Sequence, residues 1–376
     1  MQSPRLDHCP EGLPVAAYLS ADWFARERRT VLARNWICAG RVADFPPGTL
    51  RAVVAGTAPV LVCRAGDGAV SAFHNTCRHR GSELCAPGEG QALGRLVTCP
   101  YHAWAYDARD GRLVSTAHAR PGADFRKEAH GLIPVATRVW AGFLFLLTDP
   151  QPDPRPLRGD VPLELLDNWP MGSLIAGHRE EVELDCNWKT FWENYSECLH
   201  CPGIHPELCD MVPVYGRGLM APNEAVDWAP GTAAAPPLKP GAQSWTMTGA
   251  PCGPVFPGLT GAERQAGFSF VTLWPSLYVV AHADHVRAVR LEPLGPDRTR
   301  LAAEWFFAPE TLAQPGFDAA GVAAFAMIVL RQDAAAAEMN QRGLGSPAAR
   351  PARLMPEEYE LLRFQRWVIR EMEDQP

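Results

Sequence analysis

The sequence lacks an excess of basic residues. Its 376 residues include 35 lysines and arginines against 42 aspartates and glutamates, which gives a formal net charge of −7. A nucleic-acid-binding protein needs a basic face that neutralises phosphates, so this balance argues against that class. Hydrophobic residues make up 47% of the chain and charged residues 20%, which is typical of a folded globular protein with an ordinary core.

Long apolar segments are also missing. The longest candidate, Val139–Leu147, has the length of a strand and falls short of the about 18 residues that a membrane span requires. The first residues, MQSPRLDHCP, contain no basic stretch followed by an apolar one, which argues against an export signal. We therefore expect a soluble cytoplasmic protein. In such a chain, eleven cysteines favour reduced thiols or metal ligands over a disulfide framework.

The chain length suggests about two domains. In the first part, short runs rich in Val and Leu are separated by PPG, AGDG, PGEG and RDG, a pattern typical of a small β domain. A proline-rich stretch, Asp149–Pro162, is the expected linker. The expected strands of this domain are Leu50–Val54, Val60–Cys63, Ala69–Phe73, Leu96–Cys99 and Phe143–Leu147.

The second part has a mixed pattern. Spaced apolar residues predict helices over Asn187–His200 and Phe317–Asn340, and Pro222–Pro257 is expected to be a long loop of the kind that covers a site. Alternating patterns predict antiparallel strands at Gly267–Trp274, Leu277–Ala281, Val286–Leu291 and Arg300–Phe307. We expect an α+β protein with a helical segment at 1–35, an all-β domain at 36–150 and a second domain at 151–376, on which the helical segment packs.

Two short motifs each offer one thiolate and one imidazole. They are Cys77-Arg-His79 and Cys99-Pro-Tyr-His102. A zinc finger usually pairs its two cysteines on one loop and its two histidines on a helix. Two loops with one Cys and one His each can instead place both thiolates on one iron and both imidazoles on the other iron of a [2Fe–2S] cluster. A mononuclear zinc site built from the same four residues is the alternative.

A second group of metal ligands lies in the segment ENYSECLHCPGIHP. Glu197 and His200 are three residues apart and would share one face of a helix, while Pro202-Gly203 would break that helix and turn His205 back. Two imidazoles and one carboxylate form the facial triad of non-haem Fe(II) oxygenases. The third ligand could be Glu197 or Asp333, and spacing alone does not choose between them.

Together the two motifs resemble the α subunit of Rieske non-haem iron oxygenases, and the resemblance covers nearly the whole chain. It implies an all-β Rieske domain with a helix-grip catalytic domain. The cluster would be held by Cys77, His79, Cys99 and His102, and the mononuclear Fe(II) by His200, His205 and Asp333. Glu197 would bridge that iron to a Rieske histidine of the neighbouring subunit of a homotrimer, and this histidine maps to His102.

The resemblance also implies the reaction. ENYxECxHC and the QRGL after Asp333 are similar to the branch of choline monooxygenase, glycine betaine demethylase and carnitine oxygenase, which hydroxylate or N-demethylate small quaternary ammonium compounds. The chain contains no G-x-G-x-x-G opening a strand–helix unit, so a separate NAD(P)H-dependent reductase, of flavin and ferredoxin type, would supply the electrons. Hydroxylation of an aromatic ring or aromatic acid is the alternative, and an electron-transfer or zinc-stabilised binding protein is the alternative of another class.

The sequence does not identify the substrate, but it offers two kinds of recognition. Aromatic rings attract quaternary ammonium groups, whereas arginines such as Arg217 and Arg264 could hold a carboxylate. The candidate aromatic residues are Trp228, Trp245, Phe256, Phe270, Trp274 and Tyr278.

Overall fold

The computed structural model describes residues 5–88, 90–149, 155–225 and 236–373. Its contacts divide the chain into two compact units, of which one comprises Arg28–Leu157 and the other Met1–Glu27 with Arg158–Pro376. The second unit is therefore discontinuous in sequence. The boundaries expected at 35/36 and 150/151 lie a few residues from these limits and remain a prediction for the ends of the domains.

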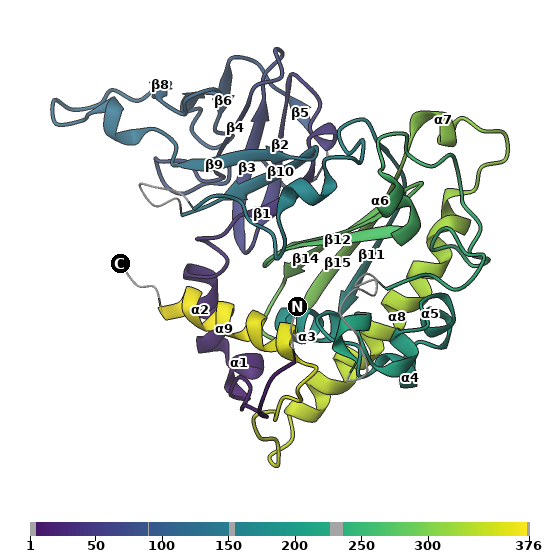
Figure 1. The fold of residues 1–376 in the computed structure, drawn as a ribbon. Helices are drawn as coiled ribbons and strands as arrows, with labels where there is room; N and C mark the ends of the chain where they lie inside the picture. Colours follow the sequence, from purple (N-terminus) through teal and green to yellow (C-terminus); the bar gives the residue numbers. More distant parts are fainter. Residues whose placement is uncertain (1–4, 89, 150–154, 226–235, 374–376) are drawn as a thin grey trace. The chain divides into compact units, whose positions relative to one another are not determined.

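The unit Arg28–Leu157 is built from two antiparallel sheets (Figure 1). The larger sheet has the strand order β1-β10-β9-β4-β3-β2-β5, and the smaller one has the order β6-β7-β8. The strands of the larger sheet are β1 (Ile37–Arg41), β2 (Thr49–Ala55), β3 (Ala58–Arg64), β4 (Val70–His74), β5 (Gln91–Ala92), β9 (Pro134–Trp140) and β10 (Phe143–Leu147). The strands of the smaller sheet are β6 (Leu96–Thr98), β7 (Ala105–Asp107) and β8 (Leu113–Ser115).

The five strands expected in this unit are all present. Phe143–Leu147 is buried along its whole length, whereas Val54 and Leu96 of the other runs are exposed. The sequence analysis missed β1, β5, β7, β8 and β9. Of these, β5, β7 and β8 are only two or three residues long, β9 contains exposed residues, and β1 has an irregular register between Cys38 and Gly40. One core cluster of this unit includes the thiols of Cys77 and Cys99 together with Tyr106, so the first metal motif is anchored in the core.

The discontinuous unit contains a five-stranded antiparallel sheet of order β11-β15-β14-β13-β12. Its strands are β11 (Ile175–Leu184), β12 (Phe268–Leu273), β13 (Leu277–His282), β14 (Val286–Pro293) and β15 (Thr299–Phe307), so the four strands expected here are confirmed. The helices of the chain are α1 (Ala16–Leu19), α2 (Ala21–Arg29), α3 (Trp188–Tyr195), α4 (Cys201–Ile204), α5 (Pro206–Met211), α6 (Gly261–Ala266), α7 (Pro309–Leu312), α8 (Ala319–Leu344) and α9 (Tyr359–Glu373).

The long helix α8 begins after Asp318, whose carboxylate accepts a hydrogen bond from the Gly321 N–H at 3.0 Å and caps the helix. By length and composition, it is the one described helix that could cross a membrane, with a mean hydropathy of 1.3 in its most apolar window. The expectation that no segment reaches this threshold is therefore wrong. Packing accounts for the composition, because α8 contacts α3 and β11 (Figure 1) and turns Gln332 and Asp333 toward the histidines described below.

The helix expected over Asn187–His200 is shorter than predicted. Asn187 caps α3 by accepting the Lys189 N–H at 3.0 Å, and the helix ends at Tyr195. The hydroxyl of Ser196 donates to the Trp192 carbonyl at 2.6 Å and marks that end. Glu197 and His200 therefore lie in a non-helical segment, and the prediction that they share a helical face is wrong.

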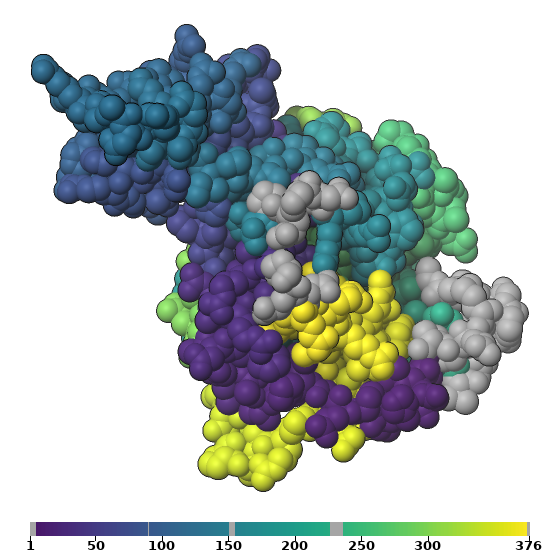
Figure 2. Space-filling view, turned by 90° about the vertical axis from the view of Figure 1, so that its left-hand side faces the viewer, coloured from purple at the N-terminus to yellow at the C-terminus, as the bar shows by residue number. Residues whose placement is uncertain are grey.

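The first and last parts of the discontinuous unit are joined by backbone hydrogen bonds. Leu6 N–H donates to the Pro356 carbonyl at 2.9 Å, Gly12 N–H to Ala352 at 2.9 Å, and Leu354 N–H to Pro10 at 2.9 Å. Figure 2 shows the N-terminal residues, in purple, beside the C-terminal helix, in yellow. These bonds place helix α9 and the N-terminal segment in one packed layer.

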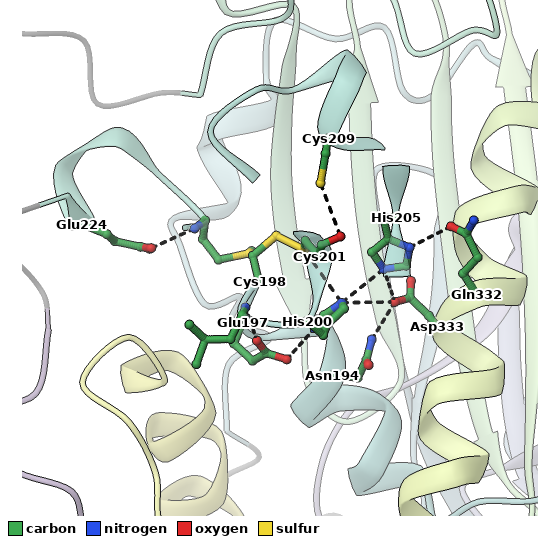
Figure 3. The surroundings of a disulfide bond; sticks show 12 residues. Asn194, Glu197, Cys198, His200, Cys201, His205, Cys209, Glu224, Gln332 and Asp333 are labelled. Atoms are coloured by element: carbon green, nitrogen blue, oxygen red, sulfur yellow. Dashed lines mark hydrogen bonds and ion pairs between the residues drawn. A yellow bond between two sulfur atoms is a disulfide. The ribbon is translucent and has the colours of Figure 1, made fainter. Parts of the chain in front are cut away.

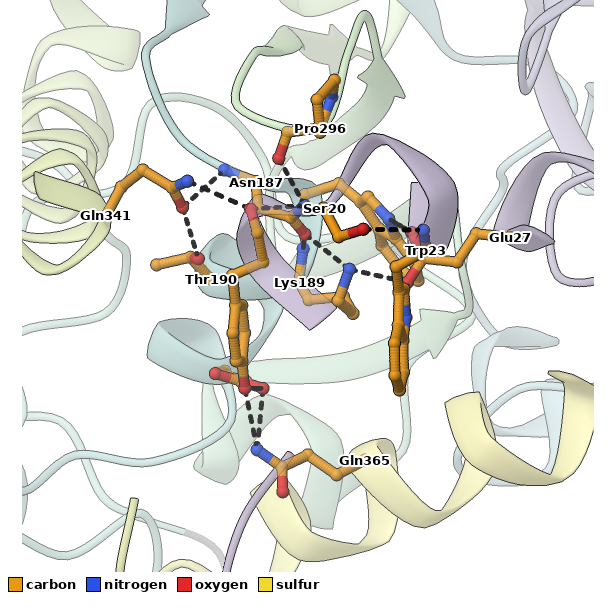
Figure 4. Close-up of polar contacts among 12 residues, drawn as sticks. Ser20, Trp23, Glu27, Asn187, Lys189, Thr190, Pro296, Gln341 and Gln365 are labelled. Atoms are coloured by element: carbon orange, nitrogen blue, oxygen red, sulfur yellow. Dashed lines mark hydrogen bonds and ion pairs between the residues drawn. The ribbon is translucent and has the colours of Figure 1, made fainter. Parts of the chain in front are cut away.

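A buried ion pair joins α2 to α3 inside this unit. The Lys189 ammonium lies 2.6 Å from the Glu27 carboxylate, and both side chains are fully buried. Glu27 also accepts hydrogen bonds from the indoles of Trp23 and Trp188, each at 3.0 Å, and Lys189 donates to Asn187 at 2.8 Å (Figure 4). Each charge thus has hydrogen-bond partners beyond the ion pair itself, which stabilises a buried pair.

Candidate functional site

The two Cys/His motifs of the β unit form loops with the same backbone design. In each loop the residue four positions after the cysteine donates its N–H to the cysteine carbonyl, Gly81 to Cys77 at 2.9 Å and Ala103 to Cys99 at 3.0 Å. Both donors have positive φ angles, 78° and 56°. This turn is what lets each loop present one thiol and one imidazole, and glycine suits it best.

The two thiols and the two imidazoles of these motifs differ in their exposure to solvent. The thiols of Cys77 and Cys99 are buried, whereas His79 is exposed and His102 half-buried. The two imidazole rings lie together, with centroids 4.7 Å apart, and the His79 ring stacks on Trp104 at 4.7 Å. Buried sulfur ligands on one side and accessible imidazoles on the other fit a [2Fe–2S] cluster with two Cys and two His ligands.

Hydrogen-bond donors surround the cysteine sulfurs. The Tyr106 hydroxyl lies 3.1 Å from Cys77 Sγ. Burial acts to raise the pKa of the Cys99 thiol, but the backbone N–H groups of Tyr101 and His102 outweigh it, and the pKa lies below its ordinary value. Donors directed at sulfur stabilise a thiolate, and hydrogen bonds to the sulfurs are one of the factors that set the potential of such a cluster.

The Tyr106→Phe variant tests this arrangement. Losing the hydroxyl removes a hydrogen bond that favours the more negative, reduced cluster, so we expect a lower reduction potential. A difference of about 1.4 kcal/mol between the two redox states corresponds to about 59 mV for one electron. Redox titration of the cluster absorption measures the shift, and an unchanged potential would show that Tyr106 does not interact with the cluster.

The second motif brings three ligand atoms together in the discontinuous unit (Figure 3). The Nε2 atoms of His200 and His205 are 3.2 Å apart, and Oδ1 of Asp333 lies 2.9 Å from His205 Nε2 and 3.5 Å from His200 Nε2. Ligands bound at about 2.1 Å with right angles between them would be about 3.0 Å apart. The three atoms therefore fit one face of a six-coordinate metal and leave the opposite face open.

The carboxylate of Glu197 points to a different atom. Its Oε1 lies 2.5 Å from Nδ1 of His200, on the far side of the ring from the convergent Nε2. The geometry therefore favours Asp333 over Glu197 as the third ligand. By accepting the Nδ1 proton, Glu197 fixes the tautomer that leaves Nε2 free to bind a metal.

Two side chains that the sequence analysis did not single out support the other ligands. Gln332 Oε1 lies 2.8 Å from Nδ1 of His205, and the Asn194 amide donates to Asp333 Oδ1 at 2.7 Å. Gln332 directly precedes Asp333, and Asn194 lies three residues before Glu197. This closeness in sequence to the predicted site residues is the only signal that could have indicated them. They orient the ligands much as Glu197 orients His200.

The charges of the triad favour cation binding. Burial acts to lower the pKa of His200, but the carboxylates of Asp333 and Glu197 outweigh it and raise the pKa to about 9. Burial likewise acts to raise the pKa of Asp333, whereas its bonds to His200 and His205 bring it below the ordinary value. A metal cation would take the place of the protons that these groups share, so binding releases protons.

A disulfide joins Cys198 and Cys201 on either side of His200 (Figure 3). The expectation of reduced thiols is wrong for this pair, because the turn between α3 and α4 brings the two Cα atoms within 4.9 Å. The sulfur of Cys201 lies 3.8 Å from His200 Nε2. In the disulfide it offers no thiolate, so the geometry favours Asp333 over Cys201 as the third ligand.

A cavity of about 400 Å³ adjoins the triad. Of the candidate aromatic residues, Trp245, Phe270, Trp274 and Tyr278 line it, together with Tyr195, which the sequence analysis missed. Phe256 is buried elsewhere, and Trp228 lies outside the described residues.

The arginines expected to hold a carboxylate do not line this cavity. Arg264 donates to the carbonyls of Leu259 and Pro257, and Arg217 is exposed. The arginine in the cavity wall is Arg287, on strand β14. The sequence signal for Arg287 was an arginine in an otherwise apolar strand. The strand also contains Arg290, and the alternation of side chains did not show which of the two arginines borders the cavity.

The fold and the two centres define an oxygenase of the Rieske type. Comparison with known proteins supports this assignment. The Rieske [2Fe-2S] domain family matches residues 35–133, and the catalytic domain of the ring hydroxylating alpha subunit family matches residues 171–374. The chain is 32% identical to the glycine betaine monooxygenase oxygenase subunit of Chromohalobacter salexigens, over 90% of this chain and 80% of that protein. It is 27% identical to the chloroplastic choline monooxygenase of Spinacia oleracea, over 97% and 78%.

A solved quaternary ammonium Rieske monooxygenase has the same fold, with a TM-score of 0.73 at 21% identity over 97% of this chain and 96% of that one. This chain belongs to the Rieske non-haem iron oxygenases, as an α subunit with a Rieske domain and a ring-hydroxylating catalytic domain. The predicted α+β fold, enzyme class and two cofactors, a [2Fe–2S] cluster and a mononuclear iron, are thereby confirmed. Oxygenase subunits of this family need a separate reductase.

Proposed function

We propose that this protein is the terminal oxygenase component that monooxygenates a small quaternary ammonium or amine compound, by hydroxylation or N-demethylation. The observation that carries the proposal is the aromatic lining of the cavity beside the triad, with Trp245, Phe270 and Tyr278 among its walls. Ring faces attract a quaternary ammonium group that carries no N–H donor. The names of the relatives, which act on glycine betaine and choline, support the same substrate class.

In this proposal Cys77, His79, Cys99 and His102 hold the cluster, and His200, His205 and Asp333 hold the iron. When bound, the iron supplies O2 activation and the cluster supplies electrons. The aromatic walls bind the ammonium group, orient its methyl groups toward the triad and exclude water.

The assembly in which the protein acts is also a proposal. We infer a homotrimer in the cytoplasm, served by a reductase with flavin and ferredoxin-type centres. Electron transfer would run between subunits, from His102 of one subunit to Glu197 of the next. The solved quaternary ammonium relative is described as transferring electrons between subunits, which supports this arrangement.

The substrate class is tested with the purified oxygenase and a compatible reductase, by following O2 and NADH consumption over a substrate panel. The panel contains trimethylammonium compounds, aromatic acids and neutral arenes. We expect coupled product formation only with the trimethylammonium compounds. Turnover of arenes or aromatic acids alone would favour ring hydroxylation, and an oxygenase that reduces and reoxidises its cluster without any product would favour electron transfer.

The Glu197→Gln variant tests the bridging role. Glutamine keeps an oxygen that can accept a hydrogen bond from His200 but removes the negative charge, so we expect both iron centres to load. Reduction of the cluster should be unchanged, whereas its reoxidation with substrate and O2 present should slow. Iron content and stopped-flow absorption measure these outcomes. Loss of the mononuclear iron would point to direct ligation by Glu197, and unchanged reoxidation would exclude the bridge.

A further inference from the structure

A buried arginine in the cavity wall forms no ion pair within the described part of the chain. Arg287 lies on β14, the central strand of its sheet, paired with Val280 on one side and Trp305 on the other. The residue is only 4% exposed. Among the described residues, nothing accepts a hydrogen bond from its buried Nε and Nη1 atoms.

This arrangement is costly unless a ligand completes it. A guanidinium does not lose its proton in a protein, so Arg287 stays charged. Burying an ion without a partner of opposite charge carries a large free-energy penalty. The rings of Trp245 and Tyr278 lie 6.0 and 5.9 Å from the guanidinium carbon, at the outer limit of a cation–π contact, and compensate only part of that penalty.

The acidic side chains of the cavity are engaged elsewhere. Asp160 accepts the N–H groups of Thr272 and Val161, at 2.7 and 2.9 Å. Glu224 accepts the Tyr359 hydroxyl at 2.8 Å, and Asp333 belongs to the triad. The two remaining acids of the lining are Glu197, which bonds to His200, and Glu360, which pairs with Arg363. No ion pair joins any of these carboxylates to Arg287 in the described part of the chain.

We propose that Arg287 binds the carboxylate of a zwitterionic substrate whose quaternary ammonium end lies among the aromatic walls near the triad. This inference rests on the proposed function and narrows it. The planar guanidinium can bind a carboxylate through two parallel hydrogen bonds, from Nη2 together with either Nε or Nη1, and both of the latter lack an acceptor among the described residues. Burial raises the pKa of the Tyr278 hydroxyl, while Arg287 acts to lower it and Asp333 to raise it, so the two ends of the site lie within electrostatic reach of one ring.

The same charge selects against a substrate without a carboxylate. A trimethylammonium alcohol would bring a second cation into a buried cavity that already holds an unpaired guanidinium, and like charges repel strongly there. A trimethylammonium acid neutralises the arginine and adds no net charge. The enzyme should therefore prefer betaine-like acids to choline-like alcohols of equal length.

The test measures binding to the holoenzyme by equilibrium dialysis. The probes are matched pairs of trimethylammonium acids and alcohols, which differ only in carrying a carboxylate or a hydroxymethyl group, with one to four methylenes in the chain. For the best-fitting length, we expect the acid to bind at least about tenfold more tightly than the alcohol. Arg287→Gln should abolish that preference, and Arg287→Lys should keep part of it, because lysine retains the charge without the paired donors.

Arg264→Gln is the matched control and should leave the preference unchanged, since Arg264 does not line the cavity. Cluster absorption and iron content establish that each variant is folded and loaded. If the wild-type enzyme binds the alcohols as tightly as the acids, or if Arg287→Gln keeps the preference for acids, the zwitterion proposal is overturned while the quaternary ammonium function stands. If neither acids nor alcohols bind, the proposed function itself fails, and the inference fails with it.

Discussion

The Asp333→Ala variant is expected to lose the mononuclear iron and its oxygenase activity while the Rieske absorption stays intact. Oδ1 of Asp333 is the only carboxylate oxygen that converges on the Nε2 atoms of both histidines in the described structure. Without it, two neutral imidazoles remain, and the Asn194 amide loses its acceptor. Loss of groups that merely orient a ligand costs about 10–100-fold in metal affinity or activity, so loss of a ligand should exceed about 100-fold.

Iron content, the visible spectrum and product formation measure this result together. Glu338→Ala offers a matched control on the same helix, because Glu338 accepts a hydrogen bond from the Asp185 N–H at 3.2 Å and does not line the cavity. The control should keep both its iron and its activity. If Asp333→Ala keeps both as well, the third ligand lies elsewhere, and Glu197 becomes the candidate.

The second large effect concerns stability. Lys189→Met should lower the free energy of unfolding by about 3–5 kcal/mol, because it leaves the buried Glu27 carboxylate without its cation. Burial lowers the pKa of Lys189, and the Glu27 carboxylate opposes this effect. Guanidinium unfolding followed by tryptophan fluorescence measures the loss.

Two further variants identify the cause of that loss. Adding Glu27→Gln to Lys189→Met removes the stranded charge and keeps an acceptor for one of the two tryptophan indoles, so about half of the lost stability should return. Arg298→Met breaks an ion pair with Glu183 in which both side chains are well exposed, at 55% and 43%, and should cost less than about 1 kcal/mol. A loss no larger for Lys189→Met than for Arg298→Met would show that the buried pair does not hold α2 to α3.

Features determined by local sequence could be predicted. The spacing of Cys77, His79, Cys99 and His102 fixes the ligand loops, and turn residues bound the strands around them. The end of α3 at Tyr195 was not predictable, because it depends on the turn that the Cys198–Cys201 disulfide closes.

Features that depend on contacts between residues distant in sequence could not be predicted either. The choice of Asp333 over Glu197 depends on how α8 packs against the segment 196–205, which no spacing encodes. Arg287 was missed for a similar reason. The alternation of side chains along a strand predicts on which face of the sheet a residue lies, but it does not show that this face borders a cavity.

The discontinuity of the larger unit has a consequence for synthesis on the ribosome. The residues of the β unit, Arg28–Leu157, emerge as one uninterrupted stretch, so this unit can fold as soon as it has left the exit tunnel. The helix that carries Glu27 emerges earlier still, but its partner Lys189 follows more than a hundred residues later. Residues 6–12 wait for Ala352, Leu354 and Pro356, close to the end of the chain. The catalytic unit can thus close only after the segment 352–356 has been synthesised.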